Sequence, residues 1–379
     1  MKKKIIPFNK PYLAQNTKDN LLKVISKRKF SDGDFQKLSE NYIKKLINSK
    51  SIKLTQSCSS ALEVSMILAN IKKGDEVIMP SFTFTSTANC VLLRGAKPIF
   101  VDINENDVNL NIDLIEKKIS KKTKAVIVVH YGGVSCDMDK LIKLKKKYNF
   151  LIIEDAAHAF YGKYKNKYLG TIGDLGAFSF HETKNIVGGQ CGALSINNPK
   201  YIKRANIILD KGTDRYYMGK KNYYSWVDIG SEYRAPELSA ALVYSQLINL
   251  KEPQNKRKQL WNNYYNSIKK IDSRILTTQV YNKKKIQSAF HIFCIIFKSK
   301  KIRENFASFM KKKGVLCFFH YYPLHLSRLG KKLSKTKLNI TEKIFNGLVR
   351  LPLYPDLKLE EQKKIINNLM LFIKKNHFL

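Results

Sequence analysis

Asp155 and Lys184 are the two residues whose types and spacing point most directly to chemistry. Asp155 ends the apolar run 150–155, and Lys184 follows 29 positions later, within the segment 179–185. A lysine amine can hold an aldehyde cofactor as a Schiff base, and a carboxylate can keep a pyridine nitrogen protonated, so that the ring withdraws electrons. We therefore predict a pyridoxal 5'-phosphate site in which Lys184 and Asp155 are the catalytic residues.

The surroundings of Lys184 distinguish it from the other lysines. The sequence has 69 Lys and Arg residues, of which ten are Arg, so Lys184 is one of 59 lysines. It follows the apolar run 177–180 and precedes Gly188, Gly189 and Gly192, which allow the backbone to turn sharply beside a bound group. Desolvation beside a positively charged cofactor would lower the pKa of this lysine toward neutrality and improve it as a nucleophile.

Small hydroxyl-bearing residues lead into a helix-like segment at residues 55–62. The periodic apolar residues that follow are Leu62, Val64, Ile67 and Leu68. A helix start exposes unpaired N–H groups and the positive end of the helix dipole, so this segment is a candidate phosphate cradle. An ordinary serine cap of a helix is the alternative interpretation.

Aromatic, histidine and carboxylate side chains could contact a flat cofactor ring. Segment 80–89 begins where a strand-like run ends, and either Phe82 or Phe84 could stack on the ring, although packing of both in the core is the alternative. His158 could donate to the phenolate oxygen of the ring, or could face solvent on a helix. A buried Asp155 carboxylate needs a charge partner, which a pyridinium nitrogen supplies; a helix-capping role is the alternative.

Short apolar runs alternate with amphipathic segments from about residue 50 to 200. This alternation is typical of an α/β protein with a mostly parallel sheet between helices, in which ligands bind at the carboxyl ends of the strands. Asp155 stands at such an end. The expected strands span residues 76–80, 98–102, 125–130 and 150–155.

The rest of the chain predicts a smaller α+β unit. With 379 residues and 44% hydrophobic content, we expect a large cofactor-binding domain at 1–245, including an N-terminal arm, and a small C-terminal domain at 246–379. The lysine-rich stretch 331–345 is interpreted as a surface loop. The other expected elements are helices at 237–250, 251–270, 301–313 and 359–375 and a strand at 290–297.

The formal net charge of +39 raises nucleic acid or an anionic membrane as a partner. The lysines are spread along the whole chain and arginines are few, so we favour a solvated lysine surface that attracts an anionic substrate, with no nucleic-acid or membrane partner. A nucleic-acid-binding protein remains the rival from another functional class.

Cysteine and hydropathy patterns indicate a cytoplasmic protein. The six cysteines form no CxxC pair and no metal-like group with histidine, so neither a disulfide framework nor a metal site is expected. The apolar run at the N-terminus is broken by Pro7 and Asn9, which makes it too short for a signal peptide. No stretch reaches the roughly 18 apolar residues of a membrane span.

Several collinear segments resemble the DegT/DnrJ/EryC1/StrS family of sugar aminotransferases. Segments 130–138, 181–185, 211–215 and 224–231 look most like the dTDP-4-amino-4,6-dideoxygalactose transaminases of that family. The resemblance covers nearly the whole chain. It also includes segments 7–11, 74–81, 154–158, 320–325 and 351–353.

The resemblance implies a fold and a set of site residues. The fold is that of fold type I pyridoxal phosphate enzymes, with a mostly parallel seven-stranded sheet between helices in the large domain. Lys184 would form the Schiff base, Asp155 would pair with the ring nitrogen, and His158 would lie by the phenolate oxygen. Phe84 would stack on the ring. The residues that would hold the phosphate are Cys58, Ser59 and Ser179.

The resemblance also implies a homodimer with its active sites at the interface. Arg234 of one subunit would reach its partner's cofactor, although Glu232 stands where many relatives carry Asn. His320 and Tyr322 are the expected sugar contacts.

The activity that this family implies is transfer of the amino group of L-glutamate to the 4-keto carbon of a dTDP-linked 4-keto-6-deoxyhexose, in the synthesis of surface-polysaccharide aminosugars. A 3-keto or UDP-linked substrate is the near alternative. Sugar dehydration on the same fold is another, but those relatives typically have histidine in place of the lysine, so Lys184 disfavours it.

Overall fold

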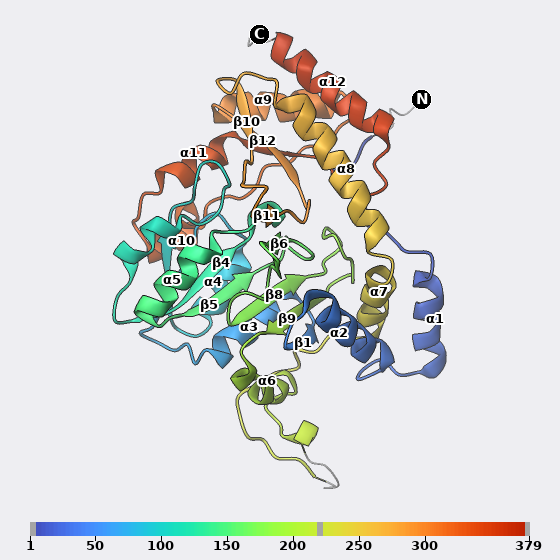
Figure 1. The fold of residues 1–379 in the computed structure, drawn as a ribbon, viewed down its shortest axis with the longest axis vertical. Helices are drawn as coiled ribbons and strands as arrows, with labels where there is room; N and C mark the ends of the chain where they lie inside the picture. Colours follow the sequence, from blue (N-terminus) through green and yellow to red (C-terminus); the bar gives the residue numbers. More distant parts are fainter. Residues whose placement is uncertain (1–4, 218–222, 376–379) are drawn as a thin grey trace.

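A seven-stranded sheet forms the centre of the computed structural model, which describes residues 5–217 and 223–375 (Figure 1). Strand β9 runs antiparallel to both of its neighbours, and the other neighbouring strands are parallel. The predicted mostly parallel seven-stranded sheet is therefore confirmed. In spatial order the strands are β1 (Ser51–Thr55), β9 (Gly192–Ile196), β8 (Leu175–Ser179), β5 (Leu151–Asp155), β4 (Thr123–Val129), β2 (Glu76–Pro80) and β3 (Lys97–Val101).

The central strands are apolar on both faces because helices cover both faces of the sheet. Val126 and Ile152 pack on one side, whereas their neighbours Ala125 and Ile153 pack on the other. The first side is covered by α2 (Asp34–Ile47), α5 (Met138–Tyr148) and α7 (Glu237–Leu247), and α1 (Thr17–Lys27) packs on α7. The second is covered by α3 (Cys58–Leu68), α4 (Thr85–Leu92) and α6 (Ile202–Leu209).

A second apolar core surrounds a three-stranded antiparallel sheet of β10 (Leu276–Thr278), β12 (Phe293–Phe297) and β13 (Leu348–Leu351). Ile6, from the start of the chain, pairs with Val315 and packs in this core. The domain boundary between residues 245 and 246 stays a prediction. The helices around this core are α8 (Lys251–Ile268), α9 (Lys300–Lys312) and α12 (Leu359–Lys375). A small separate sheet consists of β6 (Lys163–Tyr164), β7 (Lys167–Tyr168) and β11 (Ile286–Gln287).

The prediction of a surface loop at 331–345 is wrong, because the stretch contains the end of α10 (Arg328–Leu333) and most of α11 (Asn339–Gly347). Ile344 and Phe345 are buried against β12, and the Asp102 carboxylate accepts the N–H of Thr341 at the start of α11 at 2.8 Å. The many lysines of this stretch made the helical spacing of its apolar residues hard to recognise in the sequence.

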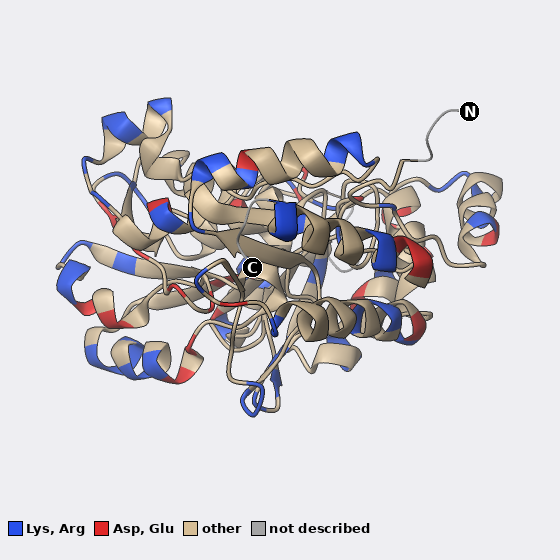
Figure 2. Cartoon of the chain, turned by 90° about the horizontal axis from the view of Figure 1, so that it is seen from above, with Lys and Arg blue, Asp and Glu red and all other residues tan. Residues whose placement is uncertain are grey.

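Lysine and arginine side chains are scattered over helices and loops across the molecule, as Figure 2 shows. They do not gather into a single stripe in this view. Among the described residues, none of the helices combines the length and the apolar character needed to cross a bilayer.

Candidate active site

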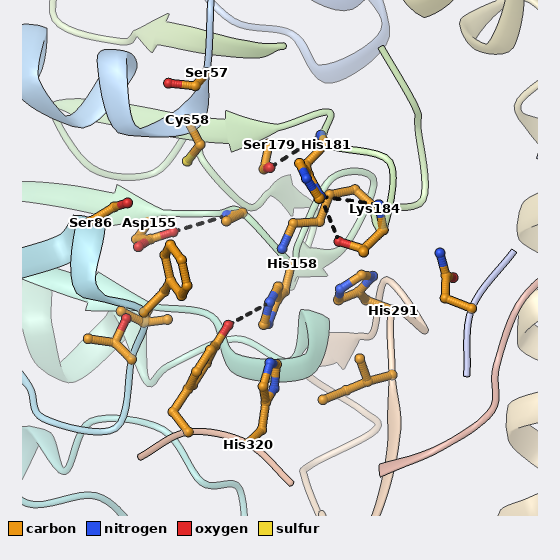
Figure 3. A pocket seen from close by; sticks show the side chains of 18 of the residues that line it. Ser57, Cys58, Ser86, Asp155, His158, Ser179, His181, Lys184, His291 and His320 are labelled. Carbon is orange, nitrogen blue, oxygen red and sulfur yellow. Dashed lines mark hydrogen bonds between the residues drawn. The ribbon is translucent and has the colours of Figure 1, made fainter. Parts of the chain in front are cut away.

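A cavity of about 730 Å³ lies at the carboxyl ends of β5 and β8 and the start of α3 (Figure 3). Its lining also includes His291, His320 and Arg350. Parallel strands bring their carboxyl ends to one edge of the sheet, so segments far apart in sequence meet there. The cavity contains eight of the predicted site residues, namely Cys58, Ser59, Phe84, Asp155, His158, Ser179, Lys184 and His320.

Asp155 is the last residue of β5, and its carboxylate is held in place by two donors. The Thr87 hydroxyl donates to Oδ2 at 2.8 Å, and the Ala157 N–H donates to Oδ1 at 3.2 Å. Burial raises the pKa of Asp155, although the Thr87 hydrogen bond and the charge of Lys184 oppose this change. The described residues provide no ion-pair partner for this carboxylate, which lines the cavity and could pair with a cationic group bound there.

Lys184 lies in the loop between β8 and β9, where its N–H donates to the His181 carbonyl oxygen at 2.9 Å. Burial lowers the pKa of Lys184 from 10.5 to about 8, while the neighbouring Cys58 and Asp155 act in the opposite direction. The lowering predicted from the sequence is confirmed. Here burial of the amine is sufficient to cause it.

The start of α3 forms the candidate phosphate cradle. Ser57 caps the helix, since its hydroxyl oxygen accepts the Ser60 N–H at 3.1 Å and its carbonyl oxygen accepts the Ala61 N–H at 3.1 Å. The N–H groups of Cys58 and Ser59 therefore stand in the first turn without an intrahelical acceptor. Gly192 permits this arrangement, because a Cβ atom there would lie 2.5 Å from the Cys58 nitrogen.

His158 is buried in a turn after β5, so the alternative of a solvent-facing helix residue is wrong. Its Nδ1 atom accepts the Gly132 N–H at 3.3 Å, and Nε2 lies 3.1 Å from the hydroxyl of Tyr321. Nε2 must then carry the proton of the neutral ring. Burial lowers the pKa of His158 well below its ordinary value, so the ring stays neutral and offers one N–H.

The two phenylalanines of segment 80–89 have different surroundings. Phe82 is buried in the core, as one alternative predicted. Phe84 has 60% of its surface exposed, lines the cavity and lies 6.3 Å from the ring of Tyr321. A flat ligand in the cavity could therefore stack on Phe84 without displacing the core.

Two predicted site residues lie outside the set that lines the cavity. The hydroxyl of Tyr322 donates to the carbonyl oxygen of Leu326, and its ring packs against Phe345. Arg234 forms ion pairs with acidic residues of its own chain, including Asp210 at 3.1 Å. The proposed roles of Tyr322 in sugar binding and of Arg234 in a partner's site stay predictions.

Four residues of the site were not predicted from the sequence, namely Thr87, Tyr321, His291 and Arg350. The ring of His291 lies 4.5 Å from that of His158, and the Nδ1 atom of His291 is 2.9 Å from the Asn185 amide oxygen. Arg350 carried one usable signal, because a charged residue interrupts the apolar run 348–353. The other three residues carried no such signal, since the local sequence pattern does not show which residues of separate segments meet at the site.

The donors present match the chemistry of pyridoxal phosphate. Among the described residues, Lys184 offers an amine of lowered pKa, Asp155 a buried carboxylate that forms no ion pair, and the first turn of α3 N–H groups without an intrahelical acceptor. Figure 3 shows the labelled Cys58, Asp155, His158, Ser179 and Lys184 around one space. These residues would hold the aldehyde, ring nitrogen and phosphate of that cofactor.

Comparisons with known proteins agree with this site. The model of the DegT/DnrJ/EryC1/StrS aminotransferase family matches residues 11–370. Spore coat polysaccharide biosynthesis protein SpsC of Bacillus subtilis is 27% identical over 373 residues, which cover 95% of each chain.

Two solved structures have the same fold. PseC of Helicobacter pylori, an aminotransferase involved in the biosynthesis of pseudoaminic acid, has a TM-score of 0.90 and 25% identity, covering 98% of this chain and 100% of PseC. The PLP form of Spr1654 from Streptococcus pneumoniae has a TM-score of 0.90 and 24% identity, covering 98% of this chain and 99% of the other. The chain therefore belongs to the DegT/DnrJ/EryC1/StrS aminotransferase family, a family of pyridoxal phosphate enzymes.

Proposed function

We propose that the protein transfers the amino group of L-glutamate to the 4-keto carbon of a dTDP-linked 4-keto-6-deoxyhexose. One observation supports the proposal above all. The amine of Lys184 has a pKa of about 8 and lines the same cavity as the buried carboxylate of Asp155. A lysine that is partly neutral at physiological pH is suited to nucleophilic attack and then to proton transfer.

Different residues of the chain would bind different parts of pyridoxal phosphate. The first turn of α3, with Cys58 and Ser59, would hold the phosphate together with Ser179. Asp155 would pair with the protonated ring nitrogen, and the Nε2–H group of His158 would donate to the phenolate oxygen. Phe84 would cover one face of the ring. When bound, the protonated ring supplies an electron sink for a carbanion.

Lys184 would act in both halves of the reaction. In the first half it would give up the aldehyde carbon of the cofactor to the amino group of L-glutamate, and its freed amine would carry a proton from the donor α-carbon to the C4′ atom. In the second half the same amine would carry a proton from C4′ to C4 of the sugar. Enclosure of the amine favours its neutral form, which is the form that accepts a proton.

The relatives support a sugar as the amino acceptor. SpsC is named for spore coat polysaccharide biosynthesis, and PseC is described as an aminotransferase in the biosynthesis of pseudoaminic acid. By analogy, we propose that the product here is an aminosugar for a surface polysaccharide. Two copies of the chain would form a homodimer, in which His320 and Tyr322 contact the sugar and Arg234 reaches the partner's cofactor.

The test measures 2-oxoglutarate release from L-glutamate in the presence of the protein, pyridoxal phosphate and dTDP-4-keto-6-deoxyglucose. We expect release that depends on the keto sugar and is abolished in Lys184→Ala. Lys140→Ala, at an exposed lysine paired with Asp113, should behave like the wild type.

Full turnover in Lys184→Ala would refute the proposal. A product that has lost a hydroxyl without gaining nitrogen would support dehydration instead. Colourless protein with DNA affinity that falls steeply with salt would favour a nucleic-acid-binding protein.

A further inference from the structure

Arg350 is a cation in the cavity to which the proposed chemistry assigns no role. It lies on β13, where it pairs with Cys294 of β12, and its side chain lines the cavity beside His320 and Tyr321. Strand β13 is otherwise apolar, with Leu348, Val349 and Leu351 in the buried cores. The arginine therefore interrupts an apolar strand at the point where that strand reaches the cavity.

Two neighbours hold the guanidinium in place. Nη2 donates to the carbonyl oxygen of Phe319 at 3.3 Å, and the guanidinium carbon lies 4.4 Å from the ring centre of Phe8. Phe8 belongs to the N-terminal arm, and its ring in turn packs edge-on against Phe318. Stacking covers a face of a planar guanidinium and leaves N–H groups at its edge available to an acceptor.

The charge of Arg350 has no compensation within the described part of the chain. No carboxylate there lies within ion-pair distance, and the buried Nε atom has no hydrogen-bond partner. Burial lowers the pKa of Arg350, yet a guanidinium stays protonated at physiological pH. An unpaired cation with a buried donor is costly, and a bound anion would remove that cost.

The other groups that line the cavity are not available as cations for such an anion. Lys184 is committed to the amino-transfer chemistry, and the start of α3 to the cofactor phosphate. Burial lowers the pKa of His158, His291 and His320 well below the ordinary value, so these rings are neutral. Arg350 is therefore the remaining permanent cation among the described lining residues.

We propose that Arg350 binds a carboxylate of the amino-acid donor, an inference that rests on the proposed aminotransferase function. The guanidinium fork matches the two oxygens of a carboxylate in one plane, which gives a pair of parallel hydrogen bonds. A dicarboxylate donor brings an anion to this half-buried guanidinium, whose Nε atom is buried without a partner among the described residues. The diphosphate of a nucleotide sugar is the other anion that enters the cavity, and the experiment separates the two.

The experiment measures the two half-reactions of the purified holoenzyme separately, by the absorbance of the bound cofactor. In Arg350→Gln we expect the second-order rate constant for L-glutamate to fall by about 100-fold or more, because truncating one member of a buried charge pair has effects of that size. The rate constant for the nucleotide sugar with the aminated enzyme should change less than about threefold. Arg350→Lys keeps the charge but lacks the guanidinium fork, so its rate constant for L-glutamate should lie between those of the wild type and Arg350→Gln.

A binding measurement makes the test independent of turnover. The probe is 2-methyl-L-glutamate, which lacks the α-hydrogen and therefore cannot complete the reaction. Its Kd should rise by about 100-fold in Arg350→Gln and stay unchanged in Arg274→Gln, at an exposed arginine. Unchanged cofactor absorbance in the variants shows that the site is assembled.

Each outcome decides one point. Equal donor constants in wild type and Arg350→Gln, or a defect confined to the nucleotide-sugar half, would overturn the assignment and point to the diphosphate. If no keto sugar is aminated but binding of 2-methyl-L-glutamate depends on Arg350, the proposed sugar substrate fails while the carboxylate site stands.

Discussion

The amine of Lys184 should be far more reactive at neutral pH than an ordinary lysine amine. Burial lowers its pKa from 10.5 to about 8. At pH 7, about 9% of an amine with a pKa of 8 is neutral, whereas for a pKa of 10.5 the neutral fraction is about 0.03%, a ratio of roughly 300. Since only the neutral amine attacks, the reactivity of Lys184 should rise through pH 8 and then level off.

The assay is trace labelling of the cofactor-free protein with acetic anhydride between pH 6 and 11, with mass spectrometry of the Lys184 peptide. We expect half-maximal labelling near pH 8. Asp155→Asn is the informative variant, because the Asp155 charge raises the pKa of Lys184. Its removal should move the midpoint to lower pH.

A midpoint near 10.5 would refute the reasoning, since it would mean that water reaches the amine freely. A shift to higher pH in Asp155→Asn would contradict the attractive coupling of the two groups. Exposed lysines of the same protein serve as the internal control in each digest.

Three further predictions concern residues that support the site. Gly192→Ala should weaken pyridoxal phosphate binding at least tenfold by equilibrium dialysis, because the added Cβ would lie 2.5 Å from the Cys58 nitrogen; unchanged affinity would remove the close approach as a requirement. Thr87→Val removes the donor to Asp155, so its pKa should rise further and the acid limb of the pH–rate profile should move to higher pH; an unmoved limb contradicts this coupling. Glu154→Gln should lower the melting temperature by several degrees, because this buried carboxylate accepts from His130 and from the N–H groups of Gly170, Ile172 and Gly173; an unchanged temperature would contradict that role.

The sheet was predictable because buried parallel strands carry a strong local signal. The apolar runs ending near Pro80 and Asp155 become β2 and β5 within one residue at each end. The chemistry at the carboxyl end of β5 followed from the same pattern. The number of strands was implied only by the resemblance, and no pattern in the sequence identified β9 as the antiparallel strand.

The other wall of the cavity was less predictable. Segment 320–322 contains His320, Tyr321 and Tyr322, of which the first two line the cavity while Tyr322 packs on Phe345. This segment has no regular helix or strand, so no periodicity in the sequence tells which side chains face inward. Arg350 carried a signal as the charged residue of an apolar run, but only the structure shows that it has no counter-ion among the described residues.

Transfer of ¹⁵N from labelled L-glutamate to a nucleotide sugar tests the central claim most directly. The enzyme, pyridoxal phosphate, ¹⁵N-L-glutamate and dTDP-4-keto-6-deoxyglucose are incubated together, and the sugar product is analysed by NMR. The proposed function predicts ¹⁵N bonded to C4 of the product, with one 2-oxoglutarate formed for each amine transferred. A sugar free of ¹⁵N, with the glutamate unconsumed, would contradict it.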